Sequence, residues 1–217
     1  MAQEYVVIGL GHFGRSVARR LAALGQSVLV IDRDPQSIQE IADQVAAAVN
    51  GDSTDERTLR ELGVDSMSCA VVTIGANALE ASILTVALLH QLGVPRIIAR
   101  AVNDLHARVL RSVGAHEVLN PEAEMGQRLA THLVQPSIRD QMTLGDAILA
   151  EVEIPAQFAG KNLRDLDIRK RFEVSVMAIK RGNQVLANPT AEEVFQTGDI
   201  LVVLGTQNAV RNLSRRV

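Results

Sequence analysis

The sequence predicts an α/β protein: a Rossmann-like, doubly wound parallel sheet, followed by a helical crossover and a second, small α+β C-lobe. Three observations support this fold class. Over the first 120 residues, short runs of β-branched residues alternate with segments of helical periodicity. These strand runs are continuously apolar, which is typical of a sheet covered on both faces. From residue 148 onward, apolar residues alternate with charged ones, as in a half-exposed strand.

The first lobe is predicted to contain six strands with helices between them. The expected strands are 5–8, 27–31, 46–49, 68–74, 96–101 and 117–119. The expected helices are 12–24, 35–42, 55–62, 77–92 and 104–113. The helix over 77–92 has almost no polar face, which predicts burial on more than one side. It is either a central helix of this lobe or a subunit interface.

A helix over 120–135 is expected to join the two lobes. Asn120 is placed to cap it and Pro121 lies at its first position, while Glu122 and Glu124 complement the helix dipole. In the second lobe, strands are expected over 148–154, 174–179, 184–186 and 200–204, helices over 163–171 and 206–213, and a hairpin turn over 180–183. The predicted domains are 1–120 for the N-lobe, 121–137 for the crossover helix and linker, and 138–217 for the C-lobe.

Composition excludes several classes of function. The formal net charge of -3 argues against general nucleic-acid binding, and 2% aromatic residues supply no platform for stacking bases. Cys69 is the only cysteine, which fits a reducing cytoplasm. The first residues lack the features of a signal peptide, and no apolar run reaches the roughly 18 residues of a membrane helix. We therefore expect a cytoplasmic protein with no direct membrane insertion.

The strongest motif is the glycine fingerprint Gly9-Leu10-Gly11-His12-Phe13-Gly14, which follows an apolar strand and opens a helix. Its glycines allow a tight turn and the close approach of a diphosphate, while the helix N-terminus offers free N–H groups. Asp32 ends the second strand, where a carboxylate can accept hydrogen bonds from both ribose hydroxyls. Together these features predict a nucleotide site.

Further candidate residues follow the other strands, where ligands bind in such sheets. They are Arg33 after Asp32, Asp52 and Ser53 after the third strand, Ala76 and Asn77 after the fourth, and Arg100 at the end of the fifth. Four of these residues have a structural alternative. Asp52 and Asn77 could cap the helices that follow, Arg100 could form a salt bridge, and Arg33 could be a solvated loop cation. The negative charge of Asp32 argues against a ligand with a 2′-phosphate, although the positive charge of Arg33 could reduce that repulsion.

We expect no enzymatic activity. The five histidines show no metal-ligand spacing, and no Ser-His-Asp or Cys-His arrangement is visible. Only residues 138–217 are left for a substrate domain, and that segment is small for a dehydrogenase. A small NAD-dependent oxidoreductase remains the alternative from another class.

The chain resembles the RCK (regulator of K⁺ conductance) family, and within it the single-unit regulatory subunits of Ktr/Trk-type potassium uptake systems. The stretches that carry the resemblance are VVIGLGHFG, VLVIDRD, VVTIGAN, RIIARAVND, VGAHEVLNPEAEMG and SVMAIKRGNQVLANPTAEEVFQTGDILVVLG. The resemblance implies homodimers that assemble into an octameric ring beneath a membrane-embedded Ktr/Trk-type channel subunit. ATP and ADP would compete for the N-lobe and gate that partner, with NAD(H) as the alternative ligand. Some relatives serve other cation transporters or antiporters.

By motif position, the resemblance places Gly9, Gly11, Gly14, Asp32, Asp52 and Arg100 in the nucleotide site. It places Glu122 near a divalent cation, Mg²⁺ or Ca²⁺, at the dimer interface. Two positions depart from the family. His12 stands where relatives carry the arginine that reaches a γ-phosphate. Ser175 stands where an asparagine would complete, with Ile168-Arg169, a pattern that binds cyclic di-AMP.

Overall fold

The computed structural model describes residues 3–215. Its contacts divide the chain into two compact units, with the boundary between Ala123 and Glu124. This boundary lies inside the expected crossover helix, just beyond the predicted end of the first lobe. No helix among residues 3–215 has the length and apolar character needed to cross a membrane.

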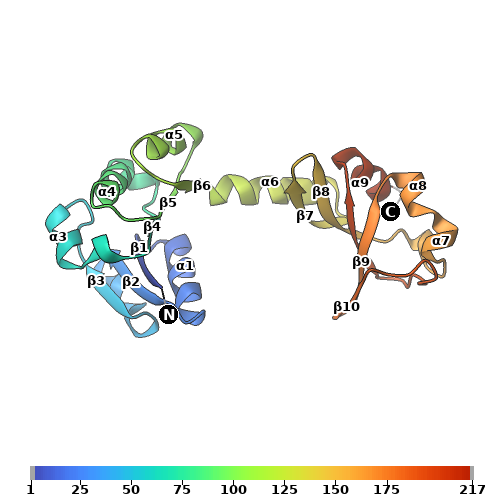
Figure 1. Cartoon of the computed structure of the whole chain (residues 1–217), viewed down its shortest axis with the longest axis horizontal. Helices are drawn as coiled ribbons and strands as arrows, with labels where there is room; N and C mark the ends of the chain where they lie inside the picture. Colours follow the sequence, from blue (N-terminus) through green and yellow to red (C-terminus); the bar gives the residue numbers. More distant parts are fainter. Residues whose placement is uncertain (1–2, 216–217) are drawn as a thin grey trace. The chain divides into compact units, whose positions relative to one another are not determined.

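The first unit is built on a fully parallel, six-stranded sheet with the order β3-β2-β1-β4-β5-β6 (Figure 1). The strands are β1 (Glu4–Ile8), β2 (Ser27–Asp32), β3 (Ala47–Asn50), β4 (Cys69–Val72), β5 (Ile97–Arg100) and β6 (Glu117–Leu119). The chain first runs outward from β1 through β2 to β3, then restarts on the other side of β1 with β4. The predicted doubly wound sheet is therefore confirmed. The topological switch point lies between β1 and β4, where such sheets bind ligands.

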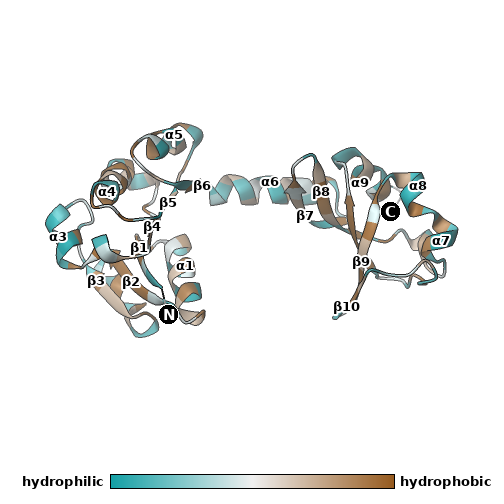
Figure 2. Cartoon of the chain, in the orientation of Figure 1, coloured by the Kyte–Doolittle hydropathy of each residue, from teal (hydrophilic) through white to brown (hydrophobic). Residues whose placement is uncertain are grey.

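Helices cover both faces of this sheet. Helices α1 (His12–Ala23) and α2 (Pro35–Gln39) pack on one face, and α3 (Glu56–Glu61), α4 (Leu79–Gln91) and α5 (Asp104–Ser112) pack on the other. Three short 3₁₀ segments join them: η1 (Ala42–Gln44), η2 (Val64–Ser66) and η3 (Ala76–Ala78). The strands between the two helical layers are apolar (Figure 2). This double cover explains why the strands read as unbroken apolar runs.

Helix α4 begins later than expected. The residue that caps it is Ala78, without a side-chain hydrogen bond, and Asn77 lies one position earlier in η3. The expectation that Asn77 caps this helix is therefore wrong. Thr85 and Leu89 are buried against the sheet side, whereas Leu84 is 46% exposed. An apolar face thus remains on the solvent side of α4, and a subunit interface there stays a prediction.

Helix α6 (Pro121–Val134) is the expected crossover helix. The side chain of Asn120 caps it, accepting a hydrogen bond of 3.1 Å from the backbone N–H of Ala123, as predicted. None of its residues is buried. Met125, Leu129 and Leu133 are exposed and stand four residues apart, which places them on one helical face. The rest of the second unit leaves this apolar stripe uncovered.

The second unit contains an antiparallel, five-stranded sheet with the order β10-β9-β11-β8-β7. Its strands are β7 (Ile138–Leu144), β8 (Ala147–Glu153), β9 (Ser175–Arg181), β10 (Gln184–Ala187) and β11 (Ile200–Gly205). Its helices are α7 (Leu163–Leu166), α8 (Ile168–Phe172) and α9 (Gln207–Ser214), with the 3₁₀ turn η4 (Ala156–Phe158). The small α+β lobe is confirmed, including the hairpin between β9 and β10.

Two elements of this unit differ from the prediction. Strand β7 was not expected, because its side chains beyond Ile138 are largely exposed and show no clear apolar alternation. Gly145, with a φ of +61°, makes the turn into β8. The helix expected over 163–171 is instead two short helices, because Asp167 adopts a φ of 43° between them.

An ion pair between the partly exposed Arg181 and the buried Asp199 holds β9 to the turn before β11. Arg181 donates from Nε to Oδ1 of Asp199 at 2.9 Å and from Nη2 to Oδ2 at 2.8 Å. Asp199 is 1% exposed and also accepts from the backbone N–H of Gln196 at 2.9 Å. Burial raises the pKa of Asp199, but these hydrogen bonds and the positive charge of Arg181 outweigh it and leave the pKa below its usual value.

Candidate nucleotide-binding site

A cleft of about 220 Å³ opens at the carboxyl edge of the parallel sheet. It is lined by Ile8, Gly9, Leu10, Gly11, Ile31, Asp32, Arg33, Gly51, Ser53, Thr73, Ile74, Gly75, Ala78 and Ala81. These residues come from the ends of β1, β2 and β4, from the loop after β3, and from the start of α4. The cleft therefore sits at the topological switch point, and its walls are mostly backbone and small side chains.

The three glycines of the fingerprint meet different constraints. Gly9 has a φ of +95°, and a Cβ there would lie 2.9 Å from the backbone nitrogen of Ile74. A Cβ on Gly14 would overlap the carbonyl oxygen of Gly9 and the hydroxyl of Thr73. Gly11 has open space around its Cβ position and caps α1. Gly9 and Gly14 therefore permit the close packing of the loop, while Gly11 leaves its surface free for a ligand.

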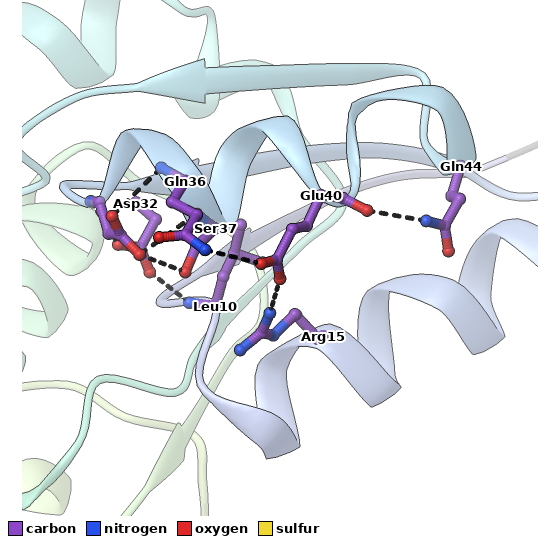
Figure 3. A network of polar contacts seen from close by, with 8 residues as sticks. Leu10, Arg15, Asp32, Gln36, Ser37, Glu40 and Gln44 are labelled. Carbon is purple, nitrogen blue, oxygen red and sulfur yellow. Dashed lines mark hydrogen bonds and ion pairs between the residues drawn. The ribbon is translucent and has the colours of Figure 1, made fainter.

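Asp32 holds the glycine loop as well as facing the cleft. Its Oδ2 accepts a hydrogen bond from the backbone N–H of Leu10, and its Oδ1 accepts one of 2.8 Å from that of Asp34 (Figure 3). The same view shows Arg15 of α1 paired with Glu40, which ties the helix after the glycine loop to the segment after β2. Each carboxylate oxygen of Asp32 has a second lone pair, so the side chain can still accept from ribose hydroxyls.

Arg33 lines the cleft and pairs with the loop after β3. Its Nη2 donates to Oδ1 of Asp52 at 2.5 Å and to the hydroxyl of Thr54 at 3.1 Å. The hydrogen bond from Arg33, joined by those from Thr54, lowers the pKa of Asp52 to about 2. Asp52 does not cap α3, the alternative considered for it. Asp55 does so, accepting from Arg57 N at 3.1 Å.

The structure brings only part of the predicted set together at the cleft. Gly9, Gly11, Asp32, Arg33 and Ser53 line it. Gly14 lies beneath the loop, and His12, Phe13, Asp52, Ala76, Asn77 and Arg100 lie outside the lining. Ser53 is buried, with its hydroxyl 2.8 Å from that of Thr85 on α4. His12 is exposed at the start of α1, beside Arg15 and Arg19.

Arg100 and Glu122 are paired with each other. Nη2 of Arg100 lies 2.5 Å from Oε1 of Glu122, and Nε lies 3.4 Å from Oε2. The salt-bridge alternative for Arg100 is thus present, and its contact with a phosphate stays a prediction. Within residues 3–215, no three His, Cys, Asp or Glu side chains are grouped as a metal site. A divalent cation at Glu122 also stays a prediction.

Several lining residues were not predicted as part of the site. Thr73 directly follows the buried strand β4 and donates to the carbonyl of Gly9 at 2.5 Å, so it holds the glycine loop in place. The sequence feature that could have identified Thr73 is a lone polar residue at the end of an apolar run. Ala78, the N-cap of α4, and Ala81, in the first turn of α4, both line the cleft. Their small size was visible, but their direction depends on where α4 begins.

A second cleft of about 370 Å³ lies in the second unit. Its lining includes Ile168, Arg169 and Ser175, together with Arg164 and Asp167. The residues of the expected cyclic di-AMP pattern are therefore neighbours. Whether this cleft holds that ligand stays a prediction.

Comparisons with known proteins agree with this architecture. Residues 5–121 match the TrkA-N domain and residues 149–217 match the TrkA-C domain. The chain is 39% identical to Ktr system potassium uptake protein C of Bacillus subtilis, covering 100% of this chain and 98% of that protein. It is 31% identical to Ktr system potassium uptake protein A of Vibrio alginolyticus, covering 97% and 96%.

Solved structures share the fold at lower identity. The crystal structure of the GsuK RCK domain matches with a TM-score of 0.69 at 20% identity, covering 100% of this chain and 48% of that one. The GsuK channel bound to NAD matches with a TM-score of 0.67 at 20% identity, covering 98% and 39%. The family models and the full-length relatives together show that this chain belongs to the RCK family and is homologous to the regulatory subunits of Ktr and Trk potassium uptake systems.

Proposed function

We propose that this protein is a nucleotide-sensing regulatory subunit of a potassium uptake system, and that it binds ATP or ADP in the cleft between the glycine loop and Asp32. NAD(H) is the alternative ligand. The observation that carries the proposal is the formed cleft at the switch point of a chain that matches Ktr proteins along nearly their whole length. The names of two GsuK structures record NAD and ADP as ligands of that RCK channel.

The chemistry of the cleft suits a nucleoside diphosphate. The first turn of α1 contains no acidic residue, so its free N–H groups and partial positive charge are available to phosphates. The open space at Gly11 lets phosphate oxygens approach the backbone. Asp32 stands at the end of β2, where it can accept from ribose hydroxyls.

The same lining favours a regulator over an enzyme. Its one carboxylate, on Asp32, is engaged by two backbone N–H groups. Its hydroxyls, on Ser53 and Thr73, are hydrogen-bonded within the protein. These side chains bind and position, and they offer no activated nucleophile paired with a base.

The sensing step is proposed to act through His12 and Arg100, which would contact the γ-phosphate of ATP but find no such group in ADP. Arg100 is 17% exposed and paired with Glu122, so contact with a phosphate would draw it from that carboxylate. Glu122 would then be free to bind Mg²⁺ or Ca²⁺. A ligand shifts a conformational equilibrium only by its differential affinity for the two states, and the γ-phosphate would supply that difference.

The signal would pass to a membrane-embedded Ktr/Trk-type channel subunit. The exposed stripe of Met125, Leu129 and Leu133 on α6 supports a homodimer, and such dimers would assemble into a homo-octameric ring. The protein would lie in the cytoplasm at the inner face of the cell membrane, held there by its partner. Cyclic di-AMP in the second cleft would add a further input, for which Arg164 and Arg169 provide cations suited to phosphates.

Replacing Asp32 with alanine is expected to weaken ADP binding by about 1.5–3 kcal/mol, because charge-assisted hydrogen bonds to the ribose are lost. Isothermal titration calorimetry on the intact protein measures this change. Asp32→Asn separates the support of the glycine loop from the binding of the ribose, because it keeps an acceptor for the N–H of Leu10 and removes the charge. Asp43→Ala, exposed and outside the cleft lining, is the control and should leave the affinity unchanged. Equal ADP affinity in the wild type and Asp32→Ala would refute this placement of the ribose.

A further inference from the structure

The loops that follow β2 and β3 meet at the edge of the cleft because these two strands are neighbours in the sheet. Strands β2 and β3 pair in register, with Asp32 opposite Asn50. Gly51 donates from its backbone N–H to the carbonyl of Asp32 at 3.0 Å, and the Asn50 side chain does so at 3.1 Å. Arg33 and Asp52 follow directly beyond these contacts, so their pairing joins the two loops beside the cleft that Asp32 and Arg33 line.

The pair contributes little to folding but fixes the guanidinium. The side chains of Arg33 and Asp52 are 58% and 47% exposed, and an ion pair this exposed contributes about 0–1 kcal/mol to stability. Its geometry is nevertheless defined. Oδ1 of Asp52 accepts from Arg33 and from both the backbone and the hydroxyl of Thr54, at 2.5, 2.9 and 2.6 Å. Arg33 therefore lines the cleft with one of its nitrogens already committed.

The position of Arg33 matters because of what a 2′-phosphate requires. In dinucleotide-binding folds, an acid at the end of the second strand binds the ribose hydroxyls, and an arginine nearby accommodates a 2′-phosphate. This chain has both, since Asp32 and Arg33 are adjacent. The charges at this corner are Asp32, Asp34, Asp52 and Arg33, which sum to -2. A phosphate monoester with a charge of about -1.5 to -2 would meet net repulsion here.

We propose that the Arg33–Asp52 pair determines nucleotide specificity: it keeps Arg33 engaged, so the cleft accepts adenine nucleotides with a free 2′-hydroxyl and excludes those with a 2′-phosphate. This inference rests on the proposed function. It assigns to Asp52 the role of neutralising and holding Arg33, beyond any contact of its own with the nucleotide. Because the pKa of Asp52 is lowered to about 2, the pair remains charged throughout the physiological pH range.

The test compares two ligands that differ in one group. Adenosine 5′-monophosphate and adenosine 2′,5′-bisphosphate compete against a fluorescent ADP analogue bound to the intact protein. The wild type should bind the monophosphate at least about tenfold more tightly, since the 2′-phosphate adds like charge. Asp52→Asn keeps the side-chain shape and an acceptor, removes the negative charge that holds Arg33, and brings the charge sum to -1. It should reduce the ratio of the two affinities by about tenfold.

A double variant shows whether Arg33 is responsible. In Asp52→Asn combined with Arg33→Gln, the gain in bisphosphate affinity should disappear, because no cation remains to receive the phosphate. The inference is overturned if the wild type binds both ligands equally, if Asp52→Asn leaves the ratio unchanged, or if the double variant keeps the gain. Failure of the wild type to bind the ADP analogue would instead overturn the proposed function, and this inference with it.

Discussion

Alanine at position 14 is expected to abolish nucleotide binding and to destabilise the first unit by about 1–3 kcal/mol or more. Its Cβ would overlap the carbonyl oxygen of Gly9 and the hydroxyl of Thr73, and the carbonyl belongs to the backbone of the loop itself. The loop and α1 would have to separate, which would displace the N–H groups that we propose bind the phosphates. Thermal unfolding and calorimetric titration with ADP measure the two effects.

Gly11→Ala is the matched comparison within the same loop. Nothing lies within 4 Å of its Cβ position, and its φ of -61° suits any residue. The variant should therefore lose much less stability than Gly14→Ala, by no more than the cost of alanine in place of glycine at the helix N-cap, about 1 kcal/mol. It should still lose nucleotide affinity, because the added methyl group would occupy the space that we propose for phosphate. Loss of stability without loss of affinity in Gly11→Ala would contradict this division of roles.

Replacing Asp199 with alanine is expected to destabilise the second unit by about 1.5–3 kcal/mol, because Arg181 loses the carboxylate that binds it twice and keeps only Glu193 and the carbonyl of Val194. The backbone N–H of Gln196 would lose its acceptor as well. Scanning calorimetry is the appropriate measurement, since the two units can unfold in separate transitions. Glu192→Ala removes an exposed partner of Arg164 and is the control, with a change within about 0.5 kcal/mol.

Lowering the pH should remove the difference in stability between the wild type and Asp199→Ala. The pKa of Asp199 is lowered in the folded state, so its ionised form stabilises the fold at neutral pH. That contribution is lost as the pH falls through the lowered pKa, because the folded carboxylate must then take up a proton. The unfolding temperatures of the wild type and Asp199→Ala should converge toward low pH. A constant difference down to the acid limit would mean that packing, not charge, carries the effect.

The first unit could be predicted almost completely because its signals are local. Unbroken apolar strands, a glycine fingerprint after β1 and an acid at the end of β2 all follow from single segments of the chain. Their meeting at one edge then follows from the parallel topology. The same reasoning failed for β7, whose exposed side chains hide a strand, and for the break at Asp167, which depends on one left-handed residue.

The site was less predictable because its finer contacts join distant loops. The pairing of Arg33 with Asp52 depends on the register of β2 and β3, which neither loop specifies. Arg100 and Glu122 were predicted for different ligands, yet they bind each other in this chain. The backbone contacts of Asp32 were also hidden, since the sequence shows the carboxylate but not the loop N–H that it accepts.

The position of a bound nucleotide tests the central claim most directly. Crystals of the intact protein soaked with ADP should show the diphosphate against the backbone at Gly11 and the start of α1. The ribose should lie within hydrogen-bond distance of the Asp32 carboxylate. An ADP molecule bound elsewhere, or a cleft closed by protein atoms at saturating ADP, would contradict the assignment of this chain as a sensor that reads nucleotides at its glycine loop.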